Sequence, residues 1–457
     1  MTPAKRRRDD SPPASPSNAD SDTEAAAAPH VDGAYLDTVN RACLDFDFEQ
    51  LCSVSLSNNN VYACLVCGRY YQGRGKQTHA YFHSINDDHH VFINLRTCNA
   101  YVLPDNYEVA DRSLNDIKDA IRPPYSPQLV AQLDGRPEPG YDLRGRPYLP
   151  GFVGLNRIKN SSYMNAVVQM LAHVPPIRDA LLLLPDLDSR PVLLQRMACL
   201  VRKMWHSRLF KAHVSPHELA QEVVGRSKRR FGLDAEGDAF DFLIWLLNAL
   251  HMDLGGTRKK GSSVIYTAFQ GQICATTQPP ETDAKTDIPQ VALTTLLQRY
   301  NGSTVVESQG KARRYQPLRL PRYIICHIRR FSKGGLLGEK NPTVVNFPIH
   351  NVCFGDLLPH DAPQKQGNMT YDLIANICHV GEQTPASAAK QDAPGASAAP
   401  LAAESPFVAY IRCASSGKWY MLRDLQVEPA MPQMLSLSDS YIQVWQRNDG
   451  TQSDVGM

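Results

Sequence analysis

Gly151 to Pro176 reads GFVGLNRIKNSSYMNAVVQMLAHVPP, and this stretch decides how the rest of the chain is interpreted. Its second half predicts a helix with one buried face, because apolar residues recur at three- and four-residue spacing: Tyr163, Ala166, Val167, Met170, Leu171 and Val174. Pro175 and Pro176 are expected to end this helix. Ser161 and Ser162 lie at its start, where free N–H groups and a partial positive charge would favour a cysteine thiolate. The residue here is serine, and we expect Ser162 to cap the helix, a contribution of about 1 kcal/mol.

The stretch resembles the cysteine box of the ubiquitin-specific proteases, G-L-x-N-x-G-N-T-C-Y-M-N-x-x-x-Q. The matching residues are Gly154, Leu155, Asn160, Tyr163, Met164, Asn165 and Gln169. The nucleophile position falls on Ser162, the oxyanion-hole asparagine on Arg157, and the usual glycine on Lys159. The resemblance implies an α+β chain with the ubiquitin-specific-protease (papain-like cysteine protease) fold. The residues that shape the box are therefore present, whereas those at its catalytic positions are changed.

The other catalytic positions of that family are also changed. The histidine box G-H-Y-x-A-Y corresponds to residues 405–410, with Pro406 in place of the histidine, and the orienting acid or amide after W-Y-x-F corresponds to Arg423. A cysteine protease needs a thiolate, a base and a group that orients the base. With Ser162, Pro406, Arg423 and Arg157 at the four positions, we expect no catalytic residues and therefore a pseudoenzyme. Activity through Ser162, or through a displaced thiol (Cys326 or Cys378), is the enzyme alternative.

The periodicity of the remaining sequence predicts helices first and strands later. Residues 192–205 and 237–250 have helical spacing, and the second segment resembles the Q-D-A-x-E-F-L box of the same family. Residues 320–331, 371–379, 407–410 and 419–427 are predicted as strands.

Composition sets the broad class of the protein. A chain of 457 residues suggests two or three domains, and 43% hydrophobic and 21% charged residues are typical of a soluble protein. A net charge of +2 gives no global attraction to nucleic acid or membrane, and no apolar run is long enough for a transmembrane helix. The N-terminus has no apolar secretory region, so the 11 cysteines are expected to be reduced or metal-bound.

The predicted divisions follow changes in composition along the chain. They are a disordered tail at 1–34, a zinc-finger domain at 35–124, a Pro- and Gly-rich linker at 125–148, the pseudoenzyme domain at 149–447 with a disordered insertion at 381–404, and a disordered tail at 448–457. The insertion is expected to join two neighbouring strands. Lys5-Arg6-Arg7-Arg8 in the first tail is consistent with a nuclear import signal or with a solvated tail.

A metal site is predicted between residues 64 and 90. Cys64-x-x-Cys67 is followed by His79, His83, His89 and His90, and two thiolates on a turn with two later histidines can complete a tetrahedral zinc site. The alternative is reduced core cysteines beside surface histidines. The segment resembles the small α/β UBP-type zinc finger that often precedes ubiquitin-specific proteases. That resemblance implies the ligand set Cys64, Cys67, His83 and His89.

The same comparison with the family limits the cofactor to one structural Zn²⁺. A second site at Cys52 with His79 is incomplete because Ser55 follows where a cysteine would be needed, and only Cys274 occurs in the region where the family often inserts two Cys-x-x-Cys pairs. Arg69, Tyr70 and Tyr101 are candidate remnants of a pocket for the ubiquitin tail, or else they pack the finger. Ubiquitin binding is expected to be weak.

Further stretches resemble the non-catalytic splicing-factor branch of this family, including residues 35–41, 210–218, 340–348 and 440–445. That resemblance implies a nuclear protein that assembles or stabilises the U4/U6.U5 tri-snRNP, with spliceosomal U5 and tri-snRNP proteins as partners, snRNA nearby and no membrane. A ubiquitin receptor and a residual deubiquitinase (a thiol-type ubiquitin hydrolase) are the alternatives. Local basic patches at 226–230 and 258–260 are consistent with RNA contact or with solvated loops.

Overall fold

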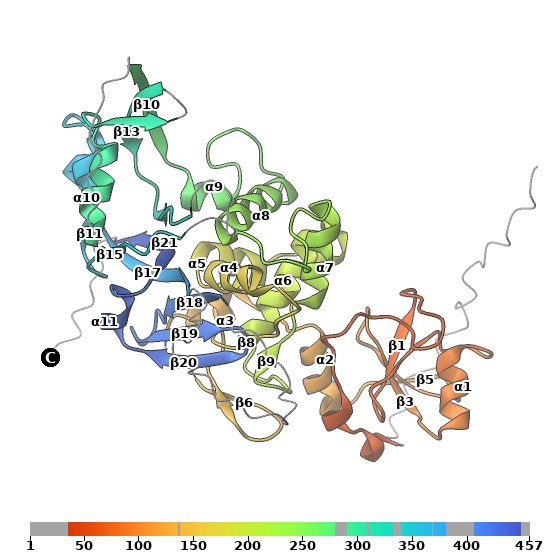
Figure 1. The fold of residues 1–457 in the computed structure, drawn as a ribbon. Helices are drawn as coiled ribbons and strands as arrows, with labels where there is room; N and C mark the ends of the chain where they lie inside the picture. The colour runs from red at the N-terminus through yellow and green to blue at the C-terminus, as the bar shows by residue number, and fades with distance from the viewer. Residues whose placement is uncertain are drawn as a thin grey trace, which may run out of the picture. The chain divides into compact units, whose positions relative to one another are not determined.

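The computed structural model describes residues 35–135, 138–278, 290–308, 311–331, 340–367, 369–380 and 406–448. The tail predicted at 1–34 and the insertion at 381–404 lie outside these residues, as does all but the first residue of the tail at 448–457. The chain divides into a small unit, which extends to Leu44 and resumes at Gln50–Ser113, and a large unit of Asp45–Glu49 and the residues from Leu114 onward (Figure 1). No helix in the described part is long and apolar enough to span a membrane.

The small unit is an antiparallel sheet with one helix. The strand order is β2-β1-β3-β4-β5, and α1 (His79–Asn86) contacts β2. The strands are β1 (Val61–Cys64), β2 (Tyr70–Gln72), β3 (Val91–Asn94), β4 (Ala100–Val102) and β5 (Tyr107–Val109). Every residue of β1 and β3 is buried, so the sheet and the helix enclose a core around Cys64 and Phe92.

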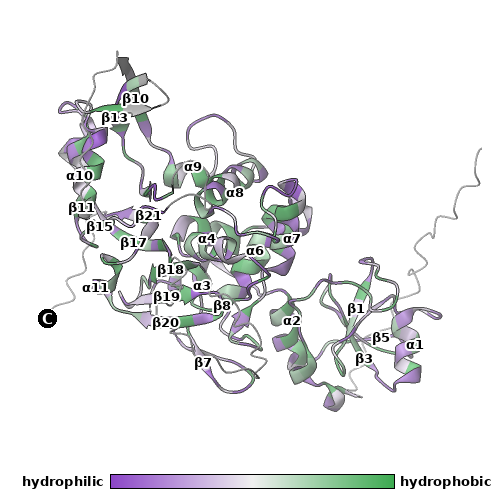
Figure 2. Ribbon diagram, viewed as in Figure 1, coloured by the Kyte–Doolittle hydropathy of each residue, from purple (hydrophilic) through white to green (hydrophobic). Residues whose placement is uncertain are grey.

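The large unit begins with its helical half, which is built around α4. In chain order the helices are α2 (Asn115–Ile121), α3 (Pro127–Gln132), α4 (Ser162–Ala172), α5 (Pro175–Leu182), α6 (Val192–Met204), α7 (His217–Arg226), α8 (Ala239–Asp253), α9 (Val264–Phe269), α10 (Leu293–Leu297) and α11 (Pro432–Leu435). Every residue of α4 is buried, and α4 contacts α5, α8 and strand β18 (Phe407–Arg412). Figure 2 shows α4 and α8 as mostly hydrophobic, in agreement with their place in the main core.

The two prolines after α4 have a double role. They end α4 as predicted, because proline has no N–H for a helical hydrogen bond, and they also form the first turn of α5, where no such bond is needed. The helix predicted at 192–205 is α6, and Asp238 caps α8 by accepting from the N–H groups of Phe240 and Asp241. The helical half therefore follows its local sequence signals closely.

The second half of the large unit is rich in strands. The main sheet has the order β14-β21-β17-β18-β19-β20, and β16 pairs with β17. Its other strands are β14 (Tyr323–His327), β16 (Val352–Cys353), β17 (Thr370–His379), β19 (Trp419–Arg423), β20 (Gln426–Ala430) and β21 (Ser440–Arg447). β17 and β18 are antiparallel neighbours, with His379 opposite Phe407, so the predicted insertion does join two adjacent strands. The mixture of helices and sheets confirms the α+β class.

Smaller sheets complete the large unit. β10 (Gln272–Gln278), β13 (Lys311–Arg319) and β12 (Val305–Ser308) form an antiparallel sheet in that order. Three two-stranded pairs are β6 (Gly140–Tyr141) with β7 (Pro147–Tyr148), β8 (Gly154–Leu155) with β9 (His213–Val214), and β11 (Gln290–Ala292) with β15 (Val344–Asn346).

The segment predicted as a linker, 125–148, differs from that prediction. Its described residues form α3 and the β6–β7 pair. Val130 is buried in the main core, and the Tyr125 hydroxyl donates to the carbonyl of Arg202 at 2.8 Å. Proline and glycine are frequent here because the turns need them, whereas a few buried apolar side chains attach the segment to the large unit.

A short segment far from Leu114 in sequence also belongs to the large unit. Asp45–Glu49, which we call the strap, has Phe46 buried beside Phe210 at a ring-centroid distance of 6.4 Å. Lys203 Nζ donates to the Phe46 carbonyl and to Asp47, both at 2.9 Å, and Lys211 pairs with Asp45. Apolar and ionic contacts therefore both hold the strap.

Candidate functional site

The start of α4 is built around two buried serines. Ser161 precedes the helix and makes no side-chain cap bond; its hydroxyl instead accepts from the N–H of Ile158 at 2.9 Å. Ser162 is the first helical residue. The prediction that Ser162 caps the helix is therefore wrong, because its hydroxyl is directed to a different partner.

That partner is Glu236, from the loop before α8. The Ser162 hydroxyl donates to Glu236 Oε1, and the N–H of Tyr163 donates to the same oxygen at 3.2 Å. Partial burial raises the pKa of Glu236 above its ordinary value, and the hydrogen bonds from Ser162 and Tyr163 oppose the rise. A side-chain carboxylate thus accepts from a backbone N–H at the start of α4, the place where a helix favours an anion.

Arg157 stands at the position of the oxyanion-hole asparagine. It follows β8, its Nε donates to the carbonyl of Lys159 at 2.9 Å, and a terminal nitrogen lies 3.9 Å from Glu236 Oε2. The guanidinium therefore contributes to holding the Glu236 carboxylate. Sequence reasoning missed Glu236 because it lies 74 residues from Ser162 and precedes the recognisable box at Gly237.

The other two degenerate positions lie at strand ends. Pro406 precedes β18, and its carbonyl accepts from the N–H of Val380 at 2.8 Å, while Arg423 ends β19. Asp424 follows in a left-handed conformation (φ 49°), and its Oδ1 accepts from Asn165 at 2.7 Å. None of the described histidines forms a hydrogen bond with Ser162, so Glu236 is the only potential base among its described partners.

The displaced cysteines are poor nucleophiles. Burial raises the pKa of Cys326 and of Cys378 to about 12, so both are thiols at neutral pH. Burial lowers the pKa of His379 to about 4, and its ring packs against Phe331 and Phe407. These residues therefore have the environment of core side chains.

The cluster in the small unit has the geometry of a metal site. Cys64, Cys67, His83 and His89 each offer a ligand atom, and these atoms lie within 4.8 Å of one another. Cys64 ends β1, His83 lies on α1 and His89 follows that helix. Gly68 closes the cysteine turn at φ 78°, where a Cβ would lie 2.2 Å from the Cys43 carbonyl oxygen, so only glycine fits.

The environment of these four side chains suits a cation. His83 Nδ1 donates to Asp87 Oδ2 at 2.7 Å, which leaves Nε2 directed at Cys67 Sγ (3.4 Å) and at His89 Nδ1 (3.0 Å). A carboxylate behind a ligating histidine is the common second layer of zinc sites. A hydrogen bond with Cys64 lowers the pKa of Cys67, which favours a thiolate. The residues present therefore fit zinc.

Two of the candidate ubiquitin-tail residues, Tyr70 and Tyr101, are covered at least in part within the small unit. Tyr70 is buried, and Arg69 is exposed before β2. Arg74 lies over the ring of Tyr101 at 4.3 Å and donates to Asn106. One face of the Tyr101 ring is thus covered by a side chain of the small unit itself.

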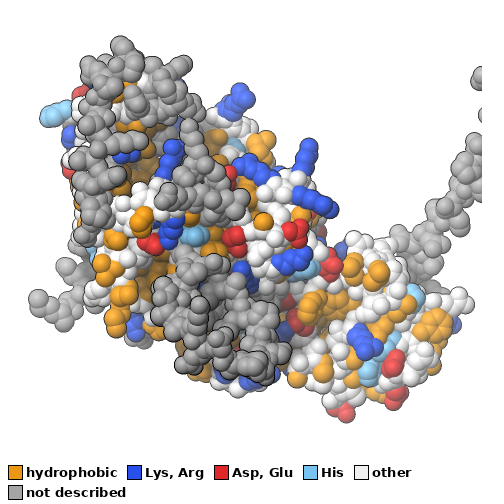
Figure 3. Space-filling view, in the orientation of Figure 1, with side chains coloured by type: hydrophobic (Ala, Val, Ile, Leu, Met, Phe, Trp, Pro, Cys, Tyr) orange, Lys and Arg blue, Asp and Glu red, His pale blue; other side chains and the backbone are white. Residues whose placement is uncertain are grey.

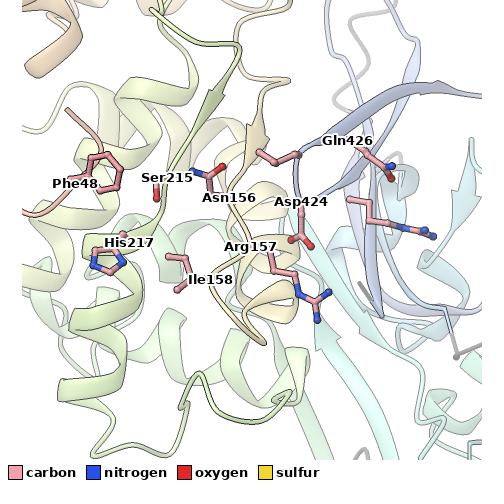
Figure 4. Close-up of a pocket in the computed structure, with 10 residues that line it drawn as sticks. Phe48, Asn156, Arg157, Ile158, Ser215, His217, Asp424 and Gln426 are labelled. Carbon is pink, nitrogen blue, oxygen red and sulfur yellow. The ribbon is translucent and has the colours of Figure 1, made fainter. Parts of the chain in front are cut away.

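A groove lies beside the degenerate positions and has a volume of about 630 Å³. Figure 4 shows Phe48 and His217 on one side and Asp424 and Gln426 on the other, with Asn156 and Ile158 between them. Arg157 and Arg423 complete the charged part of its lining. The strap, the loop after β8, the start of α7 and the β19–β20 turn thus meet in one concave surface, within the range typical of ligand sites.

The two predicted basic patches are solvent-exposed. Arg226 forms a bidentate pair with Asp253 at 2.5 and 2.7 Å, and Arg230 pairs with Asp241. Residues 228–229 and 258–260 are exposed, and Figure 3 shows Lys and Arg side chains projecting around α7 to α9. Ion pairs with acidic neighbours account for part of the first patch.

Two known family models match the chain, one over most of the large unit and one over most of the small unit. Residues 153–445 match the family model "Ubiquitin carboxyl-terminal hydrolase", and residues 52–114 match "Zn-finger in ubiquitin-hydrolases and other protein". The finger match ends beside the unit boundary at Ser113.

Individual relatives cover nearly the whole chain. The mouse "Ubiquitin carboxyl-terminal hydrolase 39" is 41% identical over 92% of this chain and 81% of its own length. The Schizosaccharomyces pombe "Probable mRNA-splicing protein ubp10" is 39% identical over 91% and 88%. The solved structure titled "Crystal structure of an essential yeast splicing factor" is 27% identical with a TM-score of 0.73, over 91% of this chain and 100% of that one. Together with the matched models, these relatives show that the chain belongs to the ubiquitin carboxyl-terminal hydrolase family and carries that family's zinc finger.

Proposed function

We propose that this protein is a non-catalytic scaffold in pre-mRNA splicing, which assembles or stabilises the U4/U6.U5 tri-snRNP in the nucleus. Its partners are spliceosomal U5 and tri-snRNP proteins. Relatives named as splicing proteins align over 91% of the chain in sequence and in structure, which supports the assignment. Because these alignments include both the small and the large unit, we propose that the whole chain takes part in this role.

The observation that carries the non-catalytic role is the Glu236 carboxylate at the start of α4. Hydrolysis of an isopeptide would need N–H donors for a developing oxyanion, a nucleophile and a base. Glu236 accepts from both the Tyr163 N–H and the Ser162 hydroxyl, so these two donors at the start of α4 are already bonded to a carboxylate. Serine without an imidazole base is barely nucleophilic.

A residual hydrolase is the second candidate, because the Ser162 hydroxyl does donate to a carboxylate whose pKa is raised. A ubiquitin vinyl-sulfone probe and a fluorogenic ubiquitin substrate separate the two. We expect neither labelling nor turnover. Turnover that disappears in Ser162→Ala, while Ser161→Ala retains it, would contradict the scaffold role.

The zinc finger is proposed to hold one structural Zn²⁺ through Cys64, Cys67, His83 and His89. The convergence of their ligand atoms and the Asp87 carboxylate behind His83 support this set. Zinc supplies folding free energy to a small unit whose core is limited. Metal analysis of the purified chain is expected to give one equivalent.

Ubiquitin binding by the finger is proposed to be weak, since Arg74 covers Tyr101 and Tyr70 is buried. Calorimetric titration with free ubiquitin tests this point. A dissociation constant in the low micromolar range or tighter would favour the receptor alternative.

Affinity purification from nuclear extract, followed by RNA analysis, tests the splicing assignment itself. We expect U4, U5 and U6 RNA to be recovered with the protein. Recovery of polyubiquitin without these RNAs would overturn the assignment in favour of a ubiquitin receptor.

A further inference from the structure

Two loops of the large unit carry exposed cations that no carboxylate of the described chain neutralises. We call them the basic loops: residues 226–230, at the end of α7, and residues 257–262, after α8. Figure 3 shows Lys and Arg side chains projecting around α7 to α9. Five of these side chains are exposed and form no hydrogen bond or ion pair with another described residue: Lys228, Arg229, Arg258, Lys259 and Lys260.

The acidic groups beside the basic loops are already engaged. Asp253, the last residue of α8, forms the bidentate pair with Arg226, and Asp241 pairs with Arg230. Glu222 on α7 also acts on Arg226. These contacts neutralise Arg226 and Arg230, so the positive charge of the surface comes from the other five cations.

The Arg226–Asp253 pair also brings the two loops to one part of the large unit. It joins the last residue of α7 to the last residue of α8, and each basic loop lies at or shortly after one of these helix ends. A single extended ligand can therefore reach both loops.

The first basic loop holds its cations in a strained backbone. Lys228 and Arg229 have φ values of 52° and 63°, in the left-handed region that glycine adopts without steric cost. The chain after α8 has Gly255 and Gly261 at its own left-handed positions, with φ values of 74° and 67°. Stability alone would favour glycine after α7 as well. Strained residues other than glycine gather at functional sites, so two cations here indicate a binding role.

Both loops are held firmly by hydrogen bonds. Phe231 is buried, and its N–H donates to the hydroxyl of Ser227 at 3.2 Å. In the second loop, the Ser262 hydroxyl donates to the Thr257 carbonyl at 2.7 Å and accepts from the Thr257 N–H at 3.0 Å. Nε2 of the buried His251 lies 3.2 Å from the same carbonyl. The cations thus project from preorganised turns, which lowers the entropic cost of binding.

A depression of about 720 Å³ adjoins the first basic loop. None of the described residues that line it is acidic, and Asp234, which follows one of them, pairs with Lys159 at 3.1 Å. A concave surface lined by one sign of charge concentrates the electric field and attracts counter-charges. The lining residues are Gln221, Val224, Gly225, Lys228, Arg229 and Leu233.

The composition of this surface favours a phosphate backbone over an acidic protein segment. Neither basic loop contains an apolar residue, whereas the core of a protein interface is apolar and depleted of charge. No aromatic side chain is exposed between residues 217 and 269, all of which the structure describes. Proteins bind single strands by stacking bases on aromatic rings, and they bind RNA duplexes mostly through phosphates and shape.

We propose that the basic loops bind the phosphate backbone of an RNA duplex without reading its sequence. The regular rows of phosphates in a duplex offer charges to both loops at once. The proposal deepens the scaffold function, and it rests on that function only in the choice of RNA as the nucleic acid.

The test uses the full chain and a fluorescein-labelled RNA duplex of about 16 base pairs, the length that a typical duplex-binding domain spans. Fluorescence anisotropy over a series of salt concentrations measures the affinity. For a duplex, the logarithm of the binding constant falls with that of the salt concentration by about 0.9 for each phosphate contact. Arg229→Glu and Lys259→Glu should therefore each reduce the slope by about one and weaken binding about eightfold at about 0.1 M salt.

Two further variants separate binding from folding. Arg229→Gly removes a cation and relieves the left-handed strain, so binding should weaken while the thermal transition of the large unit stays or rises. Lys418→Glu is the matched control, because Lys418 is an exposed cation of the β18–β19 turn, outside both loops and the depression. It should change neither the affinity nor the salt dependence.

Several results would overturn the proposal. They are no binding of the duplex, equal losses in Lys418→Glu and the loop variants, and retained affinity in Arg229→Gly together with Lys259→Glu. Equally tight binding of the single strand would replace the duplex by unpaired RNA. Equally tight binding of a glutamate-rich peptide of the same charge would replace it by an acidic protein.

Failure of this proposal can be distinguished from failure of the scaffold function. If the purified chain binds the duplex as expected but recovers no U4, U5 or U6 RNA from nuclear extract, the basic loops keep their role and the scaffold function fails. If the chain recovers these RNAs from extract but binds no RNA when purified, only the role of the basic loops is contradicted.

Discussion

The predicted ligand residues of the small unit converge on one point, whereas the start of α4 in the large unit has a serine that is bonded to a carboxylate. In the small unit, two thiols and two imidazoles converge within 4.8 Å, with a carboxylate behind one of them. In the large unit, α4 and α8 pack in the main hydrophobic core, and the first residue of α4 donates its hydroxyl to Glu236. The difference teaches that packing and chemistry are separable, because the core of α4 does not depend on what its first residue can do.

The two sites also depend differently on the fold. The proposed zinc ligands lie between residues 64 and 89 and are brought together by one strand, one turn and one helix. The degenerate groove is assembled from the strap, the loop after β8 and the β19–β20 turn, which are hundreds of residues apart. Removal of zinc should therefore unfold the small unit. Substitutions at the start of α4, beside the groove, should change the reactivity of a thiol placed there more than they change the stability of the large unit.

The largest effect is expected from loss of zinc. Cys64→Ser, or treatment with a chelator, should unfold the small unit, because metal binding contributes about 10–16 kcal/mol in zinc-finger peptides. Limited proteolysis should then cut within residues 61–109, while the large unit resists. Cys43→Ser, at an exposed cysteine outside the cluster, is the matched control and should remain resistant. Metal analysis that gives zero or two equivalents would contradict the single site.

A cavity in the core of α4 should have the next largest effect. Leu171→Ala removes a fully buried side chain and should lower the free energy of unfolding of the large unit by about 2–5 kcal/mol. Urea denaturation measures this change, and the zinc content should stay the same. Leu437→Ala, at a side chain that is 64% exposed, should cost less than about 0.5 kcal/mol. Similar losses in both variants would mean that α4 is not the centre of this core.

Reactivity at the start of α4 should respond to Glu236. In Ser162→Cys the new thiol faces a carboxylate, which disfavours the thiolate, so alkylation by iodoacetamide should be slow. Ser162→Cys with Glu236→Gln should react about tenfold faster, equivalent to one pKa unit. Mass spectrometry of the peptide that contains position 162 measures the rate. Equal rates in the single and double variants would show that Glu236 does not control this position.

The smallest effect is a change in the pH dependence of stability. The pKa of Glu236 is raised in the folded protein, so the folded state binds more protons than the unfolded state and stability falls as pH rises above the ordinary value of 4.5. Glu236→Gln removes this contribution, and its stability relative to the unchanged protein should grow from pH 4.5 to 7. Urea denaturation at several pH values measures the difference. Glu428→Gln, at an exposed carboxylate, should show no comparable trend.

Much of the fold could be predicted because its signals are local. The spacing of Tyr163 to Val174 indicated α4, and Cys64-x-x-Cys67 with its histidines indicated the metal cluster. The linker prediction at 125–148 failed because Tyr125 and Val130 bury against the large unit, which composition does not reveal. Glu236 was missed for a similar reason, since only tertiary structure brings it to Ser162.

The membership of Asp45–Glu49 in the large unit has a practical consequence for dissecting the protein. Burial is the largest single influence on the pKa of Lys203 and would lower it, but the charge and hydrogen bond of Asp47, together with smaller contributions from Glu218 and Cys199, raise it overall, so this buried ammonium depends mainly on the strap for its counter-charge. A truncated chain that starts at residue 114 would keep every helix of the large unit, yet it would leave Lys203 without its acid and the groove without Phe48. Experiments on partner binding therefore require both units in one continuous polypeptide.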